Sequence, residues 1–383
     1  MTAATTPENR SSNGKEFRIS SRTRDRLVAA GIDLSNGYPY YPTKPASLNA
    51  AKAFAQPFEY ADAAARASSL SPLAEVAELV DLTPHIGTEI RGLQLASLTD
   101  AQKDALALLV AQRGVVFLRD QEITPQEQLA LGEYWGKVHH HPSAGVLPGL
   151  PGVQTISDEL LRQHGELVDF RNPCSEQEWH TSLAHEPQPP GYTHLHYDST
   201  PPTGGDTTFS SGYVAYDKLS PPLQAFVDTL EGLYRSAHVY TNPADPDGLK
   251  VPIVTAHPLV RTHPVTGWKS LFVNRRYMVG IKGLTAADSD ALLEHLWRTY
   301  ETAFEGQVRF RWTPGTSAIW DARSTIDSTA SDTVDDTTGQ HRHATRVTTL
   351  AEVPLPASAG QSRRVALGLD PGVVQEQGRV KYY

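Results

Sequence analysis

The chain has 383 residues and a formal net charge of −9, with 39% apolar and 20% charged residues, as is ordinary for a globular protein. This acidic balance argues against nucleic-acid binding, which favours a basic stripe. No apolar run approaches the ~20 residues that span a membrane. The single cysteine, Cys174, excludes an intramolecular disulfide and favours a reducing compartment. We therefore expect a cytoplasmic protein that acts on a small molecule, with no nucleic-acid or membrane partner; a homo-oligomer is possible.

The N-terminal segment, residues 1–76, is rich in Ser, Pro, Ala and Tyr and shows no sustained hydrophobic period. Its GYPYYPTKP stretch is typical of an extended arm or linker. We expect residues 1–76 to form an N-terminal arm that is partly extended or disordered. The folded domain is expected over residues 77–383.

The first part of this domain alternates short strands and helices. Residues 79–92 predict two short strands around a Pro/Gly turn. Leu98 to Arg113 predicts an amphipathic helix that Thr99 caps. Residues 115–118 predict a buried strand, and a second helix is expected from Pro125 through Trp135.

Three consecutive histidines, His139 to His141, precede Pro142. They cannot all face one metal ion, because successive side chains of a strand point to opposite faces. We weigh a structural role for these histidines beside the proline turn equally with a role in binding. The loop-rich residues 143–178 that follow are a reasonable place for a mobile lid.

The stretch from Trp179 to Thr208 is the densest in chemistry, because four histidines fall within seventeen residues: His180, His185, His194 and His196. Imidazole is the commonest neutral metal ligand, so this density suggests a site. By strand alternation, His194, His196 and Asp198 would share one face. The alternative is a polar strand face that holds no metal.

The remaining elements decide the fold class. A helix is predicted over 219–230, two strands over 257–283, a long helix over 284–304 and a strand over 310–321. Many Gly/Pro turns and the lack of a βαβ repeat favour an antiparallel double-sheet jelly roll with flanking helices.

The motifs WHTS, PPGYTHL and GGDTTFSSGYVAYDKLSPP, followed by WDAR and HRHATRVTTL, resemble the TauD/TfdA family of taurine/α-ketoglutarate dioxygenases. The resemblance covers roughly residues 78–370. It implies a mainly β double-stranded β-helix (jelly roll), with Fe(II) as metal and 2-oxoglutarate as cosubstrate. It also implies that His180 is the first metal ligand and that Thr207 contacts 2-oxoglutarate.

Two positions depart from the family's His–Asp–His metal triad. The aspartate position is Ser182, and the second histidine position is Asp327. The family's two arginines fall on Arg342, expected to pair with the distal carboxylate of 2-oxoglutarate, and Arg346, expected near the cosubstrate or an anionic substrate group. A guanidinium suits both roles because it can clamp a carboxylate through two hydrogen bonds. Surface arginines on an edge strand are the alternative.

The resemblance also implies a substrate pocket. It gives His141 a contact with substrate, and it makes Phe272, Asn274 and Tyr277 candidate wall residues beside Arg346. An anionic substrate follows if Arg346 faces this pocket.

Three accounts of the altered triad are open. In the first, His180, Asp327 and 2-oxoglutarate hold the iron, Ser182 being a poor ligand, and the protein is an oxygenase. In the second, other histidines replace the lost ligands, the candidates being His185, His194, His196, His341 and His343. In the third, the fold has given up iron and either binds a small molecule or uses His180 and Asp327 as a proton-transfer pair. We expect the first account.

Overall fold

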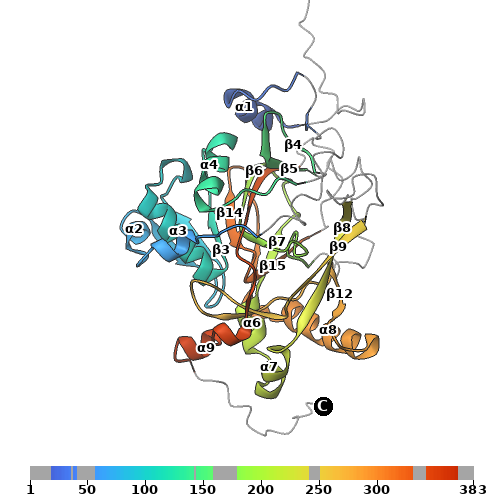
Figure 1. Cartoon of the computed structure of the whole chain (residues 1–383). Coiled ribbons are helices and arrows are strands. Elements are labelled where there is room, and N and C mark those ends of the chain that lie inside the picture. The colour runs from blue at the N-terminus through green and yellow to red at the C-terminus, as the bar shows by residue number, and fades with distance from the viewer. Residues whose placement is uncertain are drawn as a thin grey trace, which may run out of the picture.

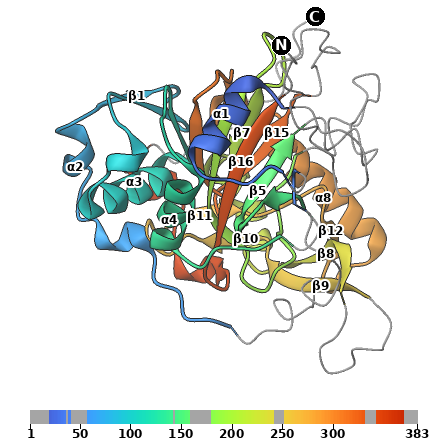
Figure 2. The same ribbon diagram turned by 90° about the horizontal axis from the view of Figure 1, so that it is seen from above.

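The computed structural model describes residues 19–35, 38–40, 57–141, 144–157, 179–240, 251–330 and 342–369. A large sheet runs through the middle of this part of the chain (Figure 1). Helices α3 (Asp100–Arg113) and α4 (Pro125–Trp135) cover one face of it, here called the outer face. Smaller sheets lie on the opposite side, the inner face, as both views show (Figure 2).

The large sheet has eight strands within the described residues, and its pairs are antiparallel except for β2 with β3. Across the sheet the order is β1 (Glu78–Asp81), β2 (Thr88–Arg91), β3 (Val115–Leu118), β14 (Ser317–Asp321), β6 (Pro190–Ser199), β16 (His343–Leu350), β5 (Leu150–Ser157) and β4 (Val146–Leu147).

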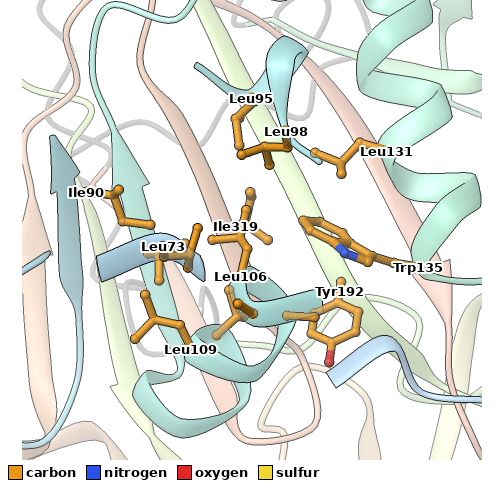
Figure 3. Packing of buried hydrophobic residues seen from close by; sticks show 14 of the residues in the cluster. Leu73, Ile90, Leu95, Leu98, Leu106, Leu109, Leu131, Trp135, Tyr192 and Ile319 are labelled. Atoms are coloured by element: carbon orange, nitrogen blue, oxygen red, sulfur yellow. The ribbon is translucent and has the colours of Figure 1, made fainter. Parts of the chain in front are cut away.

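Alternation along the central strands divides the core into two layers. Val116 and Leu118 of β3 and Ile319 of β14 point outward into a cluster with α3 and α4, where Trp135 and Tyr192 also pack (Figure 3). Their neighbours in sequence point inward into a second cluster: Val115, Phe117, Ala318 and Trp320. A strand buried on both faces therefore accounts for the unbroken apolar run VVFL, since both sets of side chains leave water.

Three smaller sheets accompany the large sheet within the described residues. One contains β13 (Gln307–Phe310), β7 (Thr207–Ser211) and β15 (Thr325–Thr329), and its Phe209 packs in the inner cluster. The others contain β12 (Met278–Ile281), β8 (Glu231–Tyr240) and β9 (Val251–Pro258), and β11 (Lys269–Leu271), β10 (Val260–Thr262) and β17 (Leu355–Pro356). The predicted mainly β jelly roll with flanking helices is confirmed, and the sheets formed by the described residues do not close into a barrel.

The helices begin where the sequence supplies caps. Thr99 accepts a hydrogen bond from Gln102 at the start of α3, and Thr124 does the same from Glu127 for α4. The remaining α-helices of the described residues are α1 (Ser21–Ala29), α2 (Ser71–Ala74), α6 (Gly212–Asp217), α7 (Pro221–Val227), α8 (Ala286–Glu301) and α9 (Arg363–Ala366). None of these helices combines the length and the apolar character needed to cross a membrane.

The single strand predicted over 310–321 was wrong. It is two strands, β13 and β14, that belong to different sheets. The turn at Pro314-Gly315 separates them, and Gly315 has a φ of 82°, which favours glycine. Residues 257–283 likewise contain more than the two strands predicted, because β10, β11 and β12 follow the end of β9.

The N-terminal segment contributes to the core. Leu27, Ile32, Leu34 and Tyr38 are buried against the outer face of the large sheet, where they meet Val347 of β16. Of the predicted lid, residues 144–157 contain β4 and β5, whereas residue 143 and residues 158–178 lie outside the described residues.

Candidate functional site

His180 and Asp327 lie side by side through a backbone bridge. Each residue's amide donates to the other's carbonyl oxygen, with both N···O distances 3.1 Å. Asp327 belongs to β15, and the loop that carries His180 therefore runs along the free edge of that strand. The ring of Tyr277 lies 6.3 Å from the His180 ring and 6.0 Å from the His185 ring, centroid to centroid.

Arg346 approaches this pair from the large sheet. Its Nε donates to Oε1 of Gln154 on the neighbouring strand β5 at 3.1 Å, and its Nη1 makes a long contact of 3.5 Å with Oγ of Ser182. Alternation along β16 puts Arg346 on the inner face with Ala344, which packs in the inner cluster. Gln154 was not among the predicted site residues; its pairing with Arg346 depends on a register that one strand's sequence does not reveal.

The charges of this pocket influence one another. Burial raises the pKa of Asp327 to about 7, and the Arg346 guanidinium opposes that rise. Burial lowers the pKa of Arg346, against the attraction of Asp327 and of Tyr277. Burial also raises the pKa of Tyr277. Near neutral pH the Asp327 carboxyl is thus divided between its neutral and ionised forms.

Arg346 also lines a small cavity of about 10 Å³, room for about one water molecule. The other lining residues come from four segments: His139, His141, Pro151, Gly152, Gln154, Leu183 and Thr348. Leu183 has a φ of 59°, unusual for a side chain of its size, so the backbone beside Ser182 is strained. His141, a predicted substrate contact, therefore shares a cavity with Arg346.

Two of the predicted wall residues lie in different surroundings. Asn274 is buried and its Nδ2 donates to the Thr181 carbonyl at 2.8 Å, while its Oδ1 has no partner among the described residues. Phe272 packs in a hydrophobic cluster, where its ring lies 5.5 Å from the Tyr234 ring and under the Arg261 guanidinium. Asn274 thus contacts Thr181, the residue before Ser182, and offers an unused acceptor there. Phe272 instead packs in the core.

Thr207 and Arg342, two of the predicted cosubstrate residues, are both buried. The Oγ1 of Thr207 accepts a hydrogen bond from Nε1 of Trp312 at 2.9 Å, so its hydroxyl already has a structural partner. Arg342 is buried and directly precedes β16. It stands four residues before Arg346 in the sequence.

Three of the proposed replacement histidines face away from this pocket. His194 and His196 of β6 point to the outer face, where both hydrogen-bond Oγ of Ser317 at 3.0 Å. His343 also lies there, with Nδ1 2.8 Å from Oδ2 of Asp198. Burial lowers the pKa of His194, and burial lowers that of His196 to about 3, so both are neutral. The second account is wrong for these three; His341 lies outside the described residues.

Within the described part of the chain, no cluster of three or more His, Cys, Asp or Glu side chains could hold a metal ion. His185 lies beside Tyr277, as noted above, and does not complete such a cluster with His180 and Asp327.

Comparison with known proteins supports one family. The family model "Taurine catabolism dioxygenase TauD, TfdA family" matches residues 78–348. An α-ketoglutarate-dependent sulfonate dioxygenase of Saccharomyces cerevisiae is 37% identical over 308 residues, covering 78% of this chain and 74% of its own. An α-ketoglutarate-dependent sulfate ester dioxygenase of Pseudomonas putida is 30% identical over 296 residues, covering 74% and 92%.

A solved structure supports the same assignment. The crystal structure of a taurine dioxygenase from Burkholderia xenovorans is 32% identical and superimposes with a TM-score of 0.63, covering 74% of this chain and 94% of its own. The chain therefore belongs to the TauD/TfdA family of α-ketoglutarate-dependent dioxygenases, oxidoreductases that use Fe(II) and 2-oxoglutarate.

Proposed function

We propose that this chain binds 2-oxoglutarate and a small sulfonate- or sulfate-ester-like anion. We further propose that it is an oxygenase whose metal site has fewer protein ligands than the family's triad. The observation that carries the proposal is Arg346: a guanidinium on the inner face, beside the His180–Asp327 pair and lining a cavity with His141. Relatives named for sulfonates and sulfate esters support the substrate class.

The residues present fit Fe(II), but with a smaller set of protein ligands than the family's triad. An imidazole and a carboxylate are ligand types that Fe(II) takes, and His180 and Asp327 supply one of each. Ser182 adds only a neutral hydroxyl, which Arg346 contacts at 3.5 Å. When bound with 2-oxoglutarate, Fe(II) supplies the oxidising chemistry of the family.

The protein's own residues position the reactants. Arg342 would hold the distal carboxylate of 2-oxoglutarate, and Arg346, held by Gln154, would orient the anionic group of the substrate. The side chains of His141 and Asn274 would complete the polar part of the pocket. Such positioning matters because misplacement by about 1 Å can cost on the order of 100-fold in rate.

A second candidate function is a metal-independent binding protein of the same fold. Two observations favour it: Ser182 lacks the charge of a carboxylate, and burial raises the pKa of Asp327 to about 7. A neutral carboxyl is a poor ligand, because metal ligands must be deprotonated. Iron would then have to displace the Asp327 proton to bind.

Turnover with alkyl sulfonates and sulfate esters separates the two candidates. The full chain is assayed in air with Fe(II) and 2-oxoglutarate, and again without oxygen in the presence of a chelator. Oxygen consumption with matching succinate release, only in the first condition, is expected. Sulfonate binding that is equally tight in both conditions, without succinate, would leave the binding-protein candidate.

Arg346→Ala tests the anion contact, and Arg276→Ala, which removes the same charge from an exposed position next to Tyr277, is its matched control. Loss of a charge-assisted hydrogen bond costs about 1.5–3 kcal/mol, so sulfonate affinity should fall roughly 10- to 100-fold in the first variant. Equal affinities of both variants and the wild type would contradict the assignment of Arg346.

A further inference from the structure

A second pocket lies on the outer face of the large sheet, away from the site of Arg346. It has a volume of about 570 Å³ and is enclosed by α1, by residues 121–124 before α4, and by His196 and Asp198 of β6. Figure 2 shows α1 over the large sheet near β16, and α1 also contacts β6. Its size falls in the range of small-molecule sites, about 300–1,000 Å³.

Arg26 of α1 reaches into the floor of this pocket with an incomplete set of partners. Its Nε donates to the Ile123 carbonyl at 3.0 Å, and its Nη1 donates to Oδ1 of Asp198 at 3.0 Å and to Oγ1 of Thr345 at 3.3 Å. Its Nη2 is buried and has no partner among the described residues. Buried donors of this kind are rare, so Nη2 calls for an acceptor that a ligand oxygen would supply.

The floor itself is unusually polar for a covered sheet face. Asp198 and His196 are 1% and 2% exposed, and the outer-face residues beside them, Ser317, Thr345 and His343, are polar too. Burying polar groups costs free energy unless every hydrogen bond is made. Ligand binding at the floor would account for polar side chains that the fold alone does not require there.

The charges around the mouth limit the kind of ligand. Arg22 precedes Arg26 by one helical turn and lines the pocket on the same side of α1. Asp25 and Glu122 are exposed carboxylates of the lining and would repel a multiply charged anion. Ala29, Ala30 and Ile123 supply apolar surface beside them. The lining therefore suits one negative charge joined to an apolar body.

We propose that this pocket binds a small organic monocarboxylate, with its carboxylate between Arg26 and Arg22 and its apolar body against Ala29, Ala30 and Ile123. The inference is independent of the proposed oxygenase function, because it concerns the opposite face of the sheet. Arg26 also contacts Thr345, the residue before Arg346. A ligand here would therefore contact Arg26, which hydrogen-bonds the strand that carries Arg346.

Calorimetric titration of the full chain with benzoate and hexanoate tests this site, and citrate serves as the multiply charged comparison. The variants are Arg26→Gln, Arg22→Ala and Ala29→Trp; the last two alter exposed positions that line the pocket, so they test it even if Arg26→Gln fails to fold. Arg24→Ala removes a charge from the same helix outside the pocket lining and is the matched control. Arg346→Ala removes the anion contact of the inner face.

Saturable binding of the monocarboxylates is expected in the wild type, in Arg24→Ala and in Arg346→Ala. Affinity should fall roughly tenfold or more in the three pocket variants, because each removes a charged contact or the space for the ligand. The proposal is overturned if neither probe binds the wild type at millimolar concentration, if binding is lost only in Arg346→Ala, or if citrate binds as tightly as benzoate.

Discussion

His180 and Asp327 exchange two backbone hydrogen bonds of 3.1 Å, so the loop that bears the first is fixed to the strand that bears the second. Their relative position therefore does not depend on a bound metal. The same arrangement sets an imidazole-bearing and a carboxyl-bearing residue side by side, next to Tyr277. Because this pair is held by the backbone, substitutions of the side chains around it should have distinct effects on binding and stability.

Arg342→Ala is expected to weaken 2-oxoglutarate binding roughly 10- to 100-fold, because a charge-assisted pair worth about 1.5–3 kcal/mol is lost. Calorimetry with 2-oxoglutarate measures the change. Arg309→Ala is the control, since Arg309 is an exposed arginine that pairs with Asp206. An unchanged affinity in Arg342→Ala would show that this arginine has another role.

Restoring the family's triad with Ser182→Asp and Asp327→His together should raise Fe(II) affinity well above that of the wild type. The first substitution adds an anionic ligand and the second an imidazole that is neutral above its usual pKa of about 6.5. Anaerobic titration with Fe(II), with Mn(II) as a check, measures the gain. The idea fails if the double variant binds metal no better than the wild type does.

Ser182→Asp alone should have a second effect, on anion binding. Nη1 of Arg346 lies 3.5 Å from the Ser182 hydroxyl, so a carboxylate at this position would compete for the guanidinium. Sulfonate affinity in the absence of metal should therefore fall, and Ser182→Asn, which is uncharged, should retain more of it. Equal affinities for the two variants would contradict this competition.

Asp327→Asn should change how stability depends on pH. The pKa of Asp327 is raised from 3.8 to about 7, so the folded state holds a proton that the unfolded state releases between these values. Stability from this group is therefore present below pH ~4 and is lost as pH rises to ~7. The uncharged variant should be more stable than the wild type at pH 8, by roughly 2–4 kcal/mol, and similar at pH 4. Urea unfolding at both pH values measures this; parallel pH profiles would refute it.

Thr207→Val should destabilise the fold even without cosubstrate, because it removes the acceptor of the buried Trp312 indole N–H, at 2.9 Å in the wild type. A buried donor without a partner costs about 1–3 kcal/mol. Thr207→Ser keeps the hydroxyl and should stay close to the wild type. Chemical unfolding of the two variants distinguishes this structural role from a role limited to 2-oxoglutarate.

Helices and strands were predictable where the sequence contains a clear helix cap or a clear hydrophobic pattern. The Thr99 cap and the apolar run 115–118 indicated α3 and β3, and both are present. The predicted strand over 310–321 instead divides between two sheets, since a local pattern does not say which partner each half will pair with. Alternation correctly predicted that His194, His196 and Asp198 share a face, but it could not say whether that face meets the pocket or the helices.

The candidate site was predictable only where motifs anchor both ends. WHTS and WDAR indicated His180 and Asp327, which the structure brings together. Gln154 gave no signal, because its contact with Arg346 follows from cross-strand register. The contacts of Arg26 and Tyr38 also depend on residues far away in the sequence, and nothing in the composition of the N-terminal segment indicated them.

Those two residues bear on where the chain can be shortened. The family match begins at residue 78, yet Tyr38 hydrogen-bonds Nε2 of His343 at 2.6 Å and Arg26 supplies the cation for buried Asp198. A fragment that starts at residue 78 would keep every family motif but would lose the Arg26 cation that pairs with Asp198 and the apolar side chains of Leu27 and Tyr38 that pack on the outer face. The folding unit is thus larger than the homology unit, and a separate peptide spanning residues 19–40 should rescue such a fragment in trans.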